Sequence, residues 1–285
     1  MGRRAPVPCQ WVTLREALKV FVEHGAGTQS AEHIKPLHWH VACRLVIEGG
    51  FPPEEIAPHP PLRAASHKGV LLLEYDPDQA DFGERTLYGG LKTKSVDVVV
   101  TKKGIGPVLA ISIKGTLNAF RNLTNRMEEA AGDCANLHIA YPALVYGFLH
   151  VLKANREGRG VKPDDVAVRR DGKIVDAICR YHDVLTRLTR REGLRNEVSK
   201  YEAVALALAC ADTPSVGEWI PGYPQRGSPL LFSDFFDRMY REYDLRFVYS
   251  APALAHATRR LGWGPDSPVF RQPGIAGFQP RLAAD

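Results

Sequence analysis

The chain contains no long hydrophobic run and no cysteine pair of the kind that binds zinc. Its 285 residues hold five cysteines and three methionines, and no apolar stretch approaches the roughly 20 residues that span a membrane. The cysteines are odd in number and form no C-x-x-C pair, so neither a disulfide framework nor a zinc knuckle is indicated. They are Cys9, Cys43, Cys134, Cys179 and Cys210.

We also recognise in the chain neither a targeting segment nor the motifs of several enzyme classes. Its opening, MGRRAPVPCQ, has no apolar run after the arginines, so no secretory signal is indicated, and we expect a cytoplasmic protein that does not contact a membrane. No P-loop, helicase or methyltransferase signature is present, and none of the serines lies in a G-x-S-x-G context. The formal charge of +5 is mildly basic, which is compatible with nucleic acid but does not identify it.

What is present is an ordinary globular composition, 45% hydrophobic and 24% charged, with alternating helical and strand patterns. We expect helices over 12–24, 37–48, about 118–131, 172–191, 196–211 and 231–243. We expect strands over 69–75, in a hairpin within 94–115, and at the start of 135–154. This pattern predicts one α/β domain over 1–285, with a central mixed sheet flanked by helices and a catalytic core over about 69–150.

The hairpin carries a carboxylate and a lysine. Asp97 lies inside the first strand, and sixteen residues separate it from Lys114 at the end of the second. Antiparallel strands joined by a short turn bring such positions side by side. A carboxylate binds Mg²⁺, and an ammonium offsets phosphate charge or orients water. One carboxylate is too little to fix Mg²⁺, yet Ser112 occupies the position two before the lysine.

The helix that follows the hairpin offers a second carboxylate. At about 100° per residue, an apolar stripe packs on the sheet and Glu128 lies at its border, whereas Glu129 points nearly opposite, towards solvent. The stripe consists of Leu117, Phe120, Leu123, Met127 and Ala131. We therefore expect Glu128 to reach over the sheet edge towards Asp97 and Lys114.

These residues resemble the motif of the PD-(D/E)xK nuclease superfamily. The Ser112-Ile113-Lys114 run followed by Glu128 is similar to the CCGG-family type II restriction endonucleases, in which Ser-x-Lys replaces Glu-x-Lys and a helix supplies the glutamate. The usual Pro-Asp is Val96-Asp97 here. The resemblance covers residues 92 to about 150. It implies a restriction-endonuclease-like fold, Asp97 and Glu128 as ligands of Mg²⁺ (or Mn²⁺), Lys114 as the catalytic lysine, and Ser112 within the site.

Polar side chains between Lys114 and Glu128 could contact DNA. Arginine reads guanine and asparagine reads adenine through paired hydrogen bonds, and both can bind phosphate. In the enzymes that the chain resembles, this interval carries base-reading residues. The candidates are Asn118, Arg121, Asn122, Asn125 and Arg126. Arg121 and Asn122 are the first choices, and a solvated helix face is the alternative explanation.

Other features compete with this interpretation. Asp97 could pair within an edge strand while Lys114 extends its ammonium to water. A metal site at His33, His38 and His40 is disfavoured, because His38 and His40 would diverge by about 200° on a helix. Glu48 is a candidate acid near the metal site, although a surface carboxylate is the favoured explanation.

The sequence thus predicts a Mg²⁺-dependent endonuclease that cuts double-stranded DNA at a specific sequence. A two-fold symmetric cut implies a homodimer or a dimer of dimers. The alternatives are a structure-specific repair or phage-defence nuclease on the same fold, and a non-catalytic DNA-binding relative.

Overall fold

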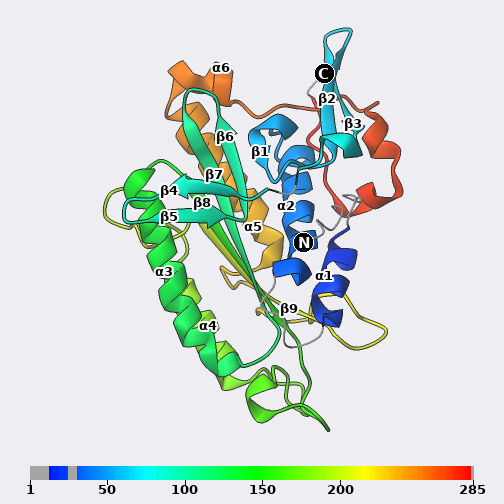
Figure 1. The fold of residues 1–285 in the computed structure, drawn as a ribbon, viewed down its shortest axis with the longest axis vertical. Coiled ribbons are helices and arrows are strands. Elements are labelled where there is room, and N and C mark those ends of the chain that lie inside the picture. The colour runs from blue at the N-terminus through cyan, green and yellow to red at the C-terminus, as the bar shows by residue number, and fades with distance from the viewer. Residues whose placement is uncertain (1–12, 25–30, 82, 284–285) are drawn as a thin grey trace, which may run out of the picture.

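The computed structural model describes residues 13–24, 31–81 and 83–283. The opening segment and Cys9, on which part of the expectation above depends, lie outside these ranges. Five strands form a mixed central sheet in the order β1-β6-β7-β8-β9. Their bounds are β1 (Ile56–Ala57), β6 (Val98–Lys102), β7 (Gly106–Thr116), β8 (Val145–Lys153) and β9 (Ala203–Ala209). The expected α/β class with a mixed central sheet is confirmed (Figure 1).

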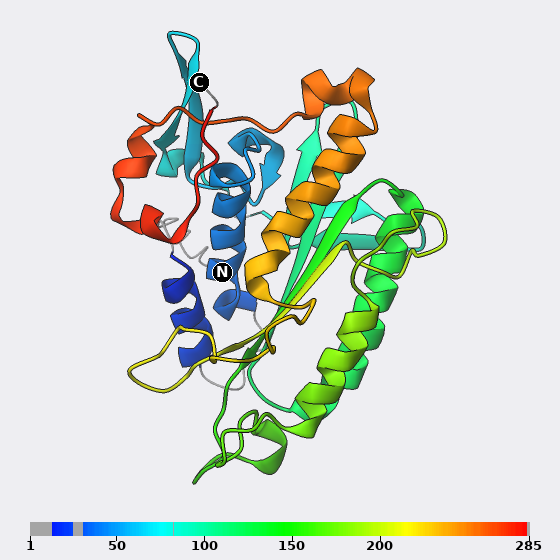
Figure 2. The same ribbon diagram turned by 180° about the vertical axis from the view of Figure 1, so that it is seen from behind.

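Helices cover both faces of this sheet, as the two opposite views show (Figures 1 and 2). On one face lie α3 (Leu123–Ala140), which connects β7 to β8, and α4 (Asp176–Arg187), which connects β8 to β9. Both connected strand pairs are parallel, as helical crossovers require. On the other face lie α1 (Leu14–Glu23), α2 (Lys35–Ile47) and α5 (Phe232–Tyr243).

The side chains of β7 and β8 alternate between two apolar clusters, one under each helical layer. In β7, Ile111 and Ile113 pack on the side of α2 and α5, whereas Ala110 packs on the side of α3 and α4. This period of two places Ser112 and Lys114 on the same side as α3. β8 follows the same rule, with Leu149 facing α5.

Two small antiparallel hairpins stand beside the central sheet. The first pairs β2 (Leu62–His67) with β3 (Val70–Tyr75), and the second pairs β4 (Arg85–Tyr88) with β5 (Thr93–Val96). After α5 come a π-helical turn (Asp244–Tyr249), α6 (Ala255–Thr258) and short 3₁₀ turns. β5 leads directly through Asp97 into β6, so the second hairpin is fastened to the central sheet at that residue.

Two expected elements were wrong. The segment 196–211 was expected to be helical, yet 203–209 form β9, all seven of whose residues are buried. Its alanines and leucines favour a helix in isolation, but burial against β8 and both helical layers decides the outcome. The strand expected at the start of 135–154 begins only at Val145, because 135–140 complete α3. Among the described residues, no helix combines the length and apolar character needed to cross a membrane.

Candidate functional site

Asp97 is the centre of the site, and the end of the β6–β7 hairpin positions it. The residue is buried, with 7% of its surface exposed. Its Oδ2 accepts hydrogen bonds from the backbone N–H of Ile113 at 2.7 Å and from the Ser112 hydroxyl at 3.2 Å. Lys114 Nζ lies 3.5 Å from the same oxygen. The structure therefore brings Asp97, Ser112 and Lys114 together, as the hairpin pattern predicts.

Lys114 is held between this carboxylate and the surface. Its side chain is 30% exposed, so the ammonium can meet a solvent-borne group while it stays paired with Asp97. In the sheet, Lys114 lies beside His150 of β8. His150 is fully buried, and its two ring nitrogens contact the hydroxyls of Tyr181 and Thr116. Because burial lowers the pKa of His150, the residue beside the lysine in the sheet is neutral, and two hydroxyls hold its ring in place.

Two further residues approach Asp97 with groups that can bind a metal ion. His38 comes from α2, and Glu84 immediately precedes β4. One ligand atom from each of His38, Glu84 and Asp97 lies within 4.8 Å of the other two. The pairing of Arg85 with Val96 in the β4–β5 hairpin puts Glu84 and Asp97 opposite each other at its base. Glu84 is further oriented by the Ser95 hydroxyl, which donates to its carboxylate at 2.7 Å.

The state of His38 suits a metal ligand. The residue is 3% exposed, and its Nε2 is buried without a hydrogen-bond partner. A buried polar atom left in this way is costly unless a ligand satisfies it. Burial lowers the pKa of His38 against the opposing attraction of Asp97 and Glu84, so the ring is held neutral, and the neutral imidazole is the form that binds metals.

A divalent cation fits this donor set. Ligand atoms around Mg²⁺ at about 2.1 Å lie roughly 3 to 4 Å apart, so a modest closure of the three side chains would suffice. Two carboxylates supply the oxygen atoms that Mg²⁺ and Mn²⁺ prefer, and an imidazole shifts the preference towards Mn²⁺. The unsatisfied Nε2 of His38 is the observation that favours such an ion.

The helix α3 presents Glu129, not Glu128, to the lysine. Glu129 lines a cavity of about 10 Å³ together with Ser112 and Lys114, close to the smallest space that holds one water molecule. Partial burial would raise the pKa of Glu129, but its bond to Arg126 and the charges of Lys114 and Lys94 outweigh that effect and lower it. Both glutamates are exposed by their residue surface, but Glu128 does not line this cavity.

This reversal has a geometric cause. α3 begins at Leu123, so the Leu117 and Phe120 that entered the expected stripe are not part of it. The buried apolar positions are Leu123, Ala130, Cys134 and Leu137. At 100° per residue they centre the packed face about 70° from the one assumed, which turns Glu129 towards the site and Glu128 away from it.

Glu48 lies elsewhere. It ends α2, where its carboxylate accepts two hydrogen bonds from Arg44, the shorter at 2.7 Å. Ten residues of helix separate it from His38, about 15 Å along the axis. It lines a different hollow with Asp244 and Arg260. Glu48 is therefore a structural ion-pair partner and does not belong to the cluster around Asp97.

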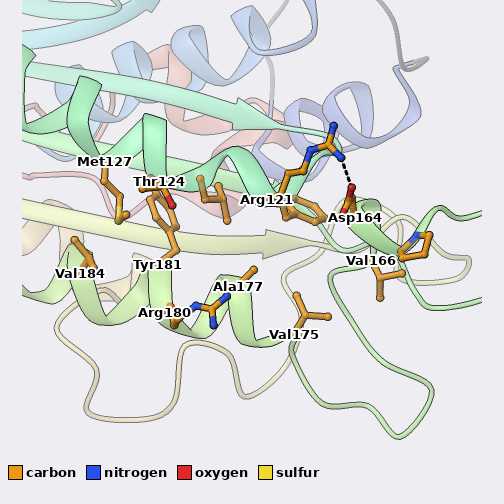
Figure 3. Close-up of a pocket in the computed structure, with 13 residues that line it drawn as sticks. Arg121, Thr124, Met127, Asp164, Val166, Val175, Ala177, Arg180, Tyr181 and Val184 are labelled. Carbon is orange, nitrogen blue, oxygen red and sulfur yellow. Dashed lines mark hydrogen bonds and ion pairs between the residues drawn. The ribbon is translucent and has the colours of Figure 1, made fainter.

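The five candidate DNA contacts lie along the start of α3 and the loop before it. Arg121 is ion-paired with Asp164 at the edge of a groove of about 520 Å³ between α3 and α4 (Figure 3). Arg126 binds Glu129 at 2.7 Å beside the cavity described above. Asn122 and Asn125 are exposed, and Asn118 is half-buried. Their role in DNA contact stays a prediction.

Sequence reasoning missed His38 and Glu84. The histidine was set aside because His38 and His40 cannot share one helix face, but only His38 approaches Asp97. Glu84 ends an acidic segment that resembles a turn, and nothing local links it to Asp97. The only sequence signal was the strand pattern 85–96, which places the two acids at the ends of one hairpin.

Comparison of the chain with family models, curated proteins and solved structures found no match. Any functional conclusion therefore depends on the geometry of the site itself.

Proposed function

We propose that the chain is a divalent-metal-dependent DNA endonuclease with a fold of the restriction-endonuclease type. The observation that carries the proposal is the set of groups around Asp97: Lys114 and Ser112 on one side, His38 and Glu84 on the other. An antiparallel hairpin continued by parallel strands through α3 is also the arrangement that the resemblance in sequence implies.

The residues would divide the work as follows. Asp97, Glu84 and His38 would hold Mg²⁺ or Mn²⁺, which when bound polarises a phosphate oxygen and lowers the pKa of water. Ser112 and the N–H of Ile113 fix the orientation of Asp97. Hydrolysis of the backbone at this site would leave 5′ phosphate ends.

Lys114 and Glu129 would act on the phosphate and on the water that attacks it. The ammonium of Lys114 is placed to donate to a phosphate oxygen or to that water, and it offsets the charge that grows on the phosphate. Glu129 stays ionised, because Arg126 and Lys114 lower its pKa. It can therefore accept a hydrogen bond from a water molecule next to the lysine.

Specific recognition and assembly complete the proposal. Asn118, Arg121, Asn122, Asn125 and Arg126 lie in the loop and 3₁₀ turn before α3 and in its first turns, and they would contact the double-stranded DNA. A symmetric double-strand cut would be made by a homodimer or a dimer of dimers.

The experiment is digestion of plasmid and mixed-sequence linear DNA with Mg²⁺ or Mn²⁺, followed by sequencing of the ends. We expect Asp97→Asn and Lys114→Ala to reduce the cleavage rate by about 10²-fold or more, because each removes a group that acts on the reacting phosphate. Glu129→Gln is expected to slow cleavage, whereas the neighbouring Glu128→Gln serves as its matched control and retains the wild-type rate.

The outcomes separate the alternatives. Discrete fragments indicate sequence recognition, and nicks or smears indicate a structure-specific nuclease. DNA binding without cleavage in either metal would favour a non-catalytic relative. Cleavage that survives both Asp97→Asn and Lys114→Ala would place the catalytic site elsewhere in the chain.

A further inference from the structure

Another hollow lies between the segment that precedes β9 and the C-terminal half of α5. Its volume is about 570 Å³. Its lining is almost entirely charged and consists of Arg190, Arg191, Glu192, Glu202, Arg238, Arg241, Glu242 and Arg246. Five arginines thus face three glutamates.

Part of this charge is neutralised within the protein. Glu202 is 1% exposed and accepts from Arg191 at 3.2 Å and from Arg246 at 2.9 Å. It also accepts from the N–H of Tyr146 at 2.7 Å. Near the rim, Arg241 binds Glu242 at 3.1 Å. These contacts build the floor of the hollow and fix the guanidinium groups of its inner arginines.

The remaining arginines have no such partners. Arg190 and Arg238 form no ion pair with a carboxylate among the residues that the structure describes. Arg238 is half-buried, and burial together with the charges of Arg190 and Arg241 lowers its pKa against the smaller opposing effects of Asp234 and Glu242. Arg190 adopts the left-handed region, with φ at 61°. The protein therefore holds like charges close together, an arrangement that an anion would relieve.

An unsatisfied donor adds an independent observation. Arg191 is 3% exposed, and its Nε is buried without a hydrogen-bond partner. Its Nη atoms already bind Glu202 and the carbonyl of Leu194. A buried N–H of a charged group is costly when unpaired, and this one belongs to a side chain that lines the hollow.

We propose that this arginine hollow is a binding site for a phosphate-type oxyanion, with Arg190 and Arg238 as its direct ligands. Guanidinium groups bind phosphate through two parallel charge-assisted hydrogen bonds, and several converging arginines suit a dianion or a diphosphate. The phosphate could belong to a small ester or to the backbone of DNA, and the two sources share this chemistry.

The site is separate from the cluster around Asp97. Glu202 binds the N–H of Tyr146, which pairs with Ala110 in the sheet, whereas Lys114 pairs with His150. Four residues along the strand correspond to roughly 13 Å. We therefore expect occupation of the hollow to need no metal at Asp97, so it can be tested without metal and without cleavage of DNA.

The test is isothermal titration of the full chain with pyrophosphate in low-salt buffer containing EDTA, beside binding of a short DNA duplex under the same conditions. Arg238→Gln and Arg190→Gln are the test variants. Arg226→Gln, which removes an exposed arginine outside the hollow, is the control matched in charge. We expect each test variant to weaken binding about tenfold or more, because each removes a charge-assisted contact.

Each outcome is decisive. A loss of pyrophosphate affinity in Arg238→Gln, absent in Arg226→Gln, supports a site for small phosphate esters. A loss of duplex affinity in the same variant, with pyrophosphate acting as a competitor, identifies the DNA backbone as the source. If neither ligand binds more weakly to Arg190→Gln and Arg238→Gln than to Arg226→Gln, the proposal is overturned.

Discussion

Lowering the pH from about 7.5 to about 5 should destabilise the fold through His150. This histidine is fully buried beside the candidate catalytic lysine. Its Nδ1 lies 2.6 Å from the Tyr181 hydroxyl, and its Nε2 lies 2.9 Å from the Thr116 hydroxyl. Burial, with smaller contributions from the charges of Arg126 and Lys114, lowers the pKa of His150 from 6.5 to about 3.

The sign and size of the effect follow from proton linkage. The folded state keeps His150 neutral down to a pH of about 3, whereas the unfolded chain binds a proton below 6.5. The contribution of neutral His150 to the free energy of unfolding is therefore fully present above pH 6.5. It is lost progressively as the pH falls from about 6.5 to about 3. One group costs about 1.4 kcal/mol per pH unit within that window, so His150 alone accounts for about 2 kcal/mol at about pH 5.

The assay is urea unfolding of the wild type and of His150→Gln at the two pH values. Glutamine can donate to one hydroxyl and accept from the other, and it does not titrate. Other histidines and the carboxylates titrate in both proteins, so the difference between the two pH effects isolates His150. The wild type is expected to lose about 2 kcal/mol more than the variant on acidification. Equal losses would refute the reasoning, since they would mean that the folded protein protonates His150 readily.

Two further predictions concern packing and buried charge. In Gly147→Ala the new Cβ would lie 2.7 Å from the Phe235 ring, so we expect a loss of about 1–3 kcal/mol in urea unfolding. Gly132→Ala is the control, because a Cβ at this position of α3 would have no heavy atom within 4 Å. It should be neutral or stabilising by up to about 1 kcal/mol. Equal losses of stability in the two variants would contradict the packing argument. Glu202→Gln removes the charge that neutralises two largely buried arginines, and a drop in thermal stability equivalent to about 3–5 kcal/mol is expected. A melting temperature within a degree or so of wild type would show that these arginines are neutralised in another way.

The parts of the site that could be predicted from the sequence are those joined by local geometry. Asp97 and Lys114 share one hairpin, and the antiparallel pairing of its strands is enough to place them together. The expected choice of Glu128 over Glu129 differs from the structure because the stripe used to orient the helix included residues that do not form the packed face. Leu117 and Phe120 lie before α3, and Met127 and Ala131 are only partly buried. Neighbouring helix residues differ by about 100°, so a packed face assigned wrongly by most of that angle exchanges their roles.

The remaining ligands depend on contacts between distant segments. His38 reaches Asp97 only because α2 packs across the sheet, and nothing near His38 in the sequence encodes that contact. The strand β9 is a second example. It is rich in helix-forming residues, yet it forms a strand because it pairs with the buried strand β8. Local patterns predict most helices and strands, but the contact of His38 with Asp97 and the strand β9 depend on burial between segments that are distant in the sequence.

The position of the β4–β5 hairpin has a consequence for how the protein would respond to a cation. Glu84 and Asp97 stand at the two ends of this hairpin, and the pairing of Arg85 with Val96 closes it just above them. An ion bound by both carboxylates would join the hairpin's two ends, so part of the binding free energy would go into ordering 85–96. The affinity for the ion and the stability of the hairpin would then be thermodynamically linked, so a change in one would change the other. Whatever contacts the exposed tip, where Tyr88 and Leu91 are each 79% exposed, would change the affinity for the ion at the base, and the ion would change the affinity at the tip by the same factor.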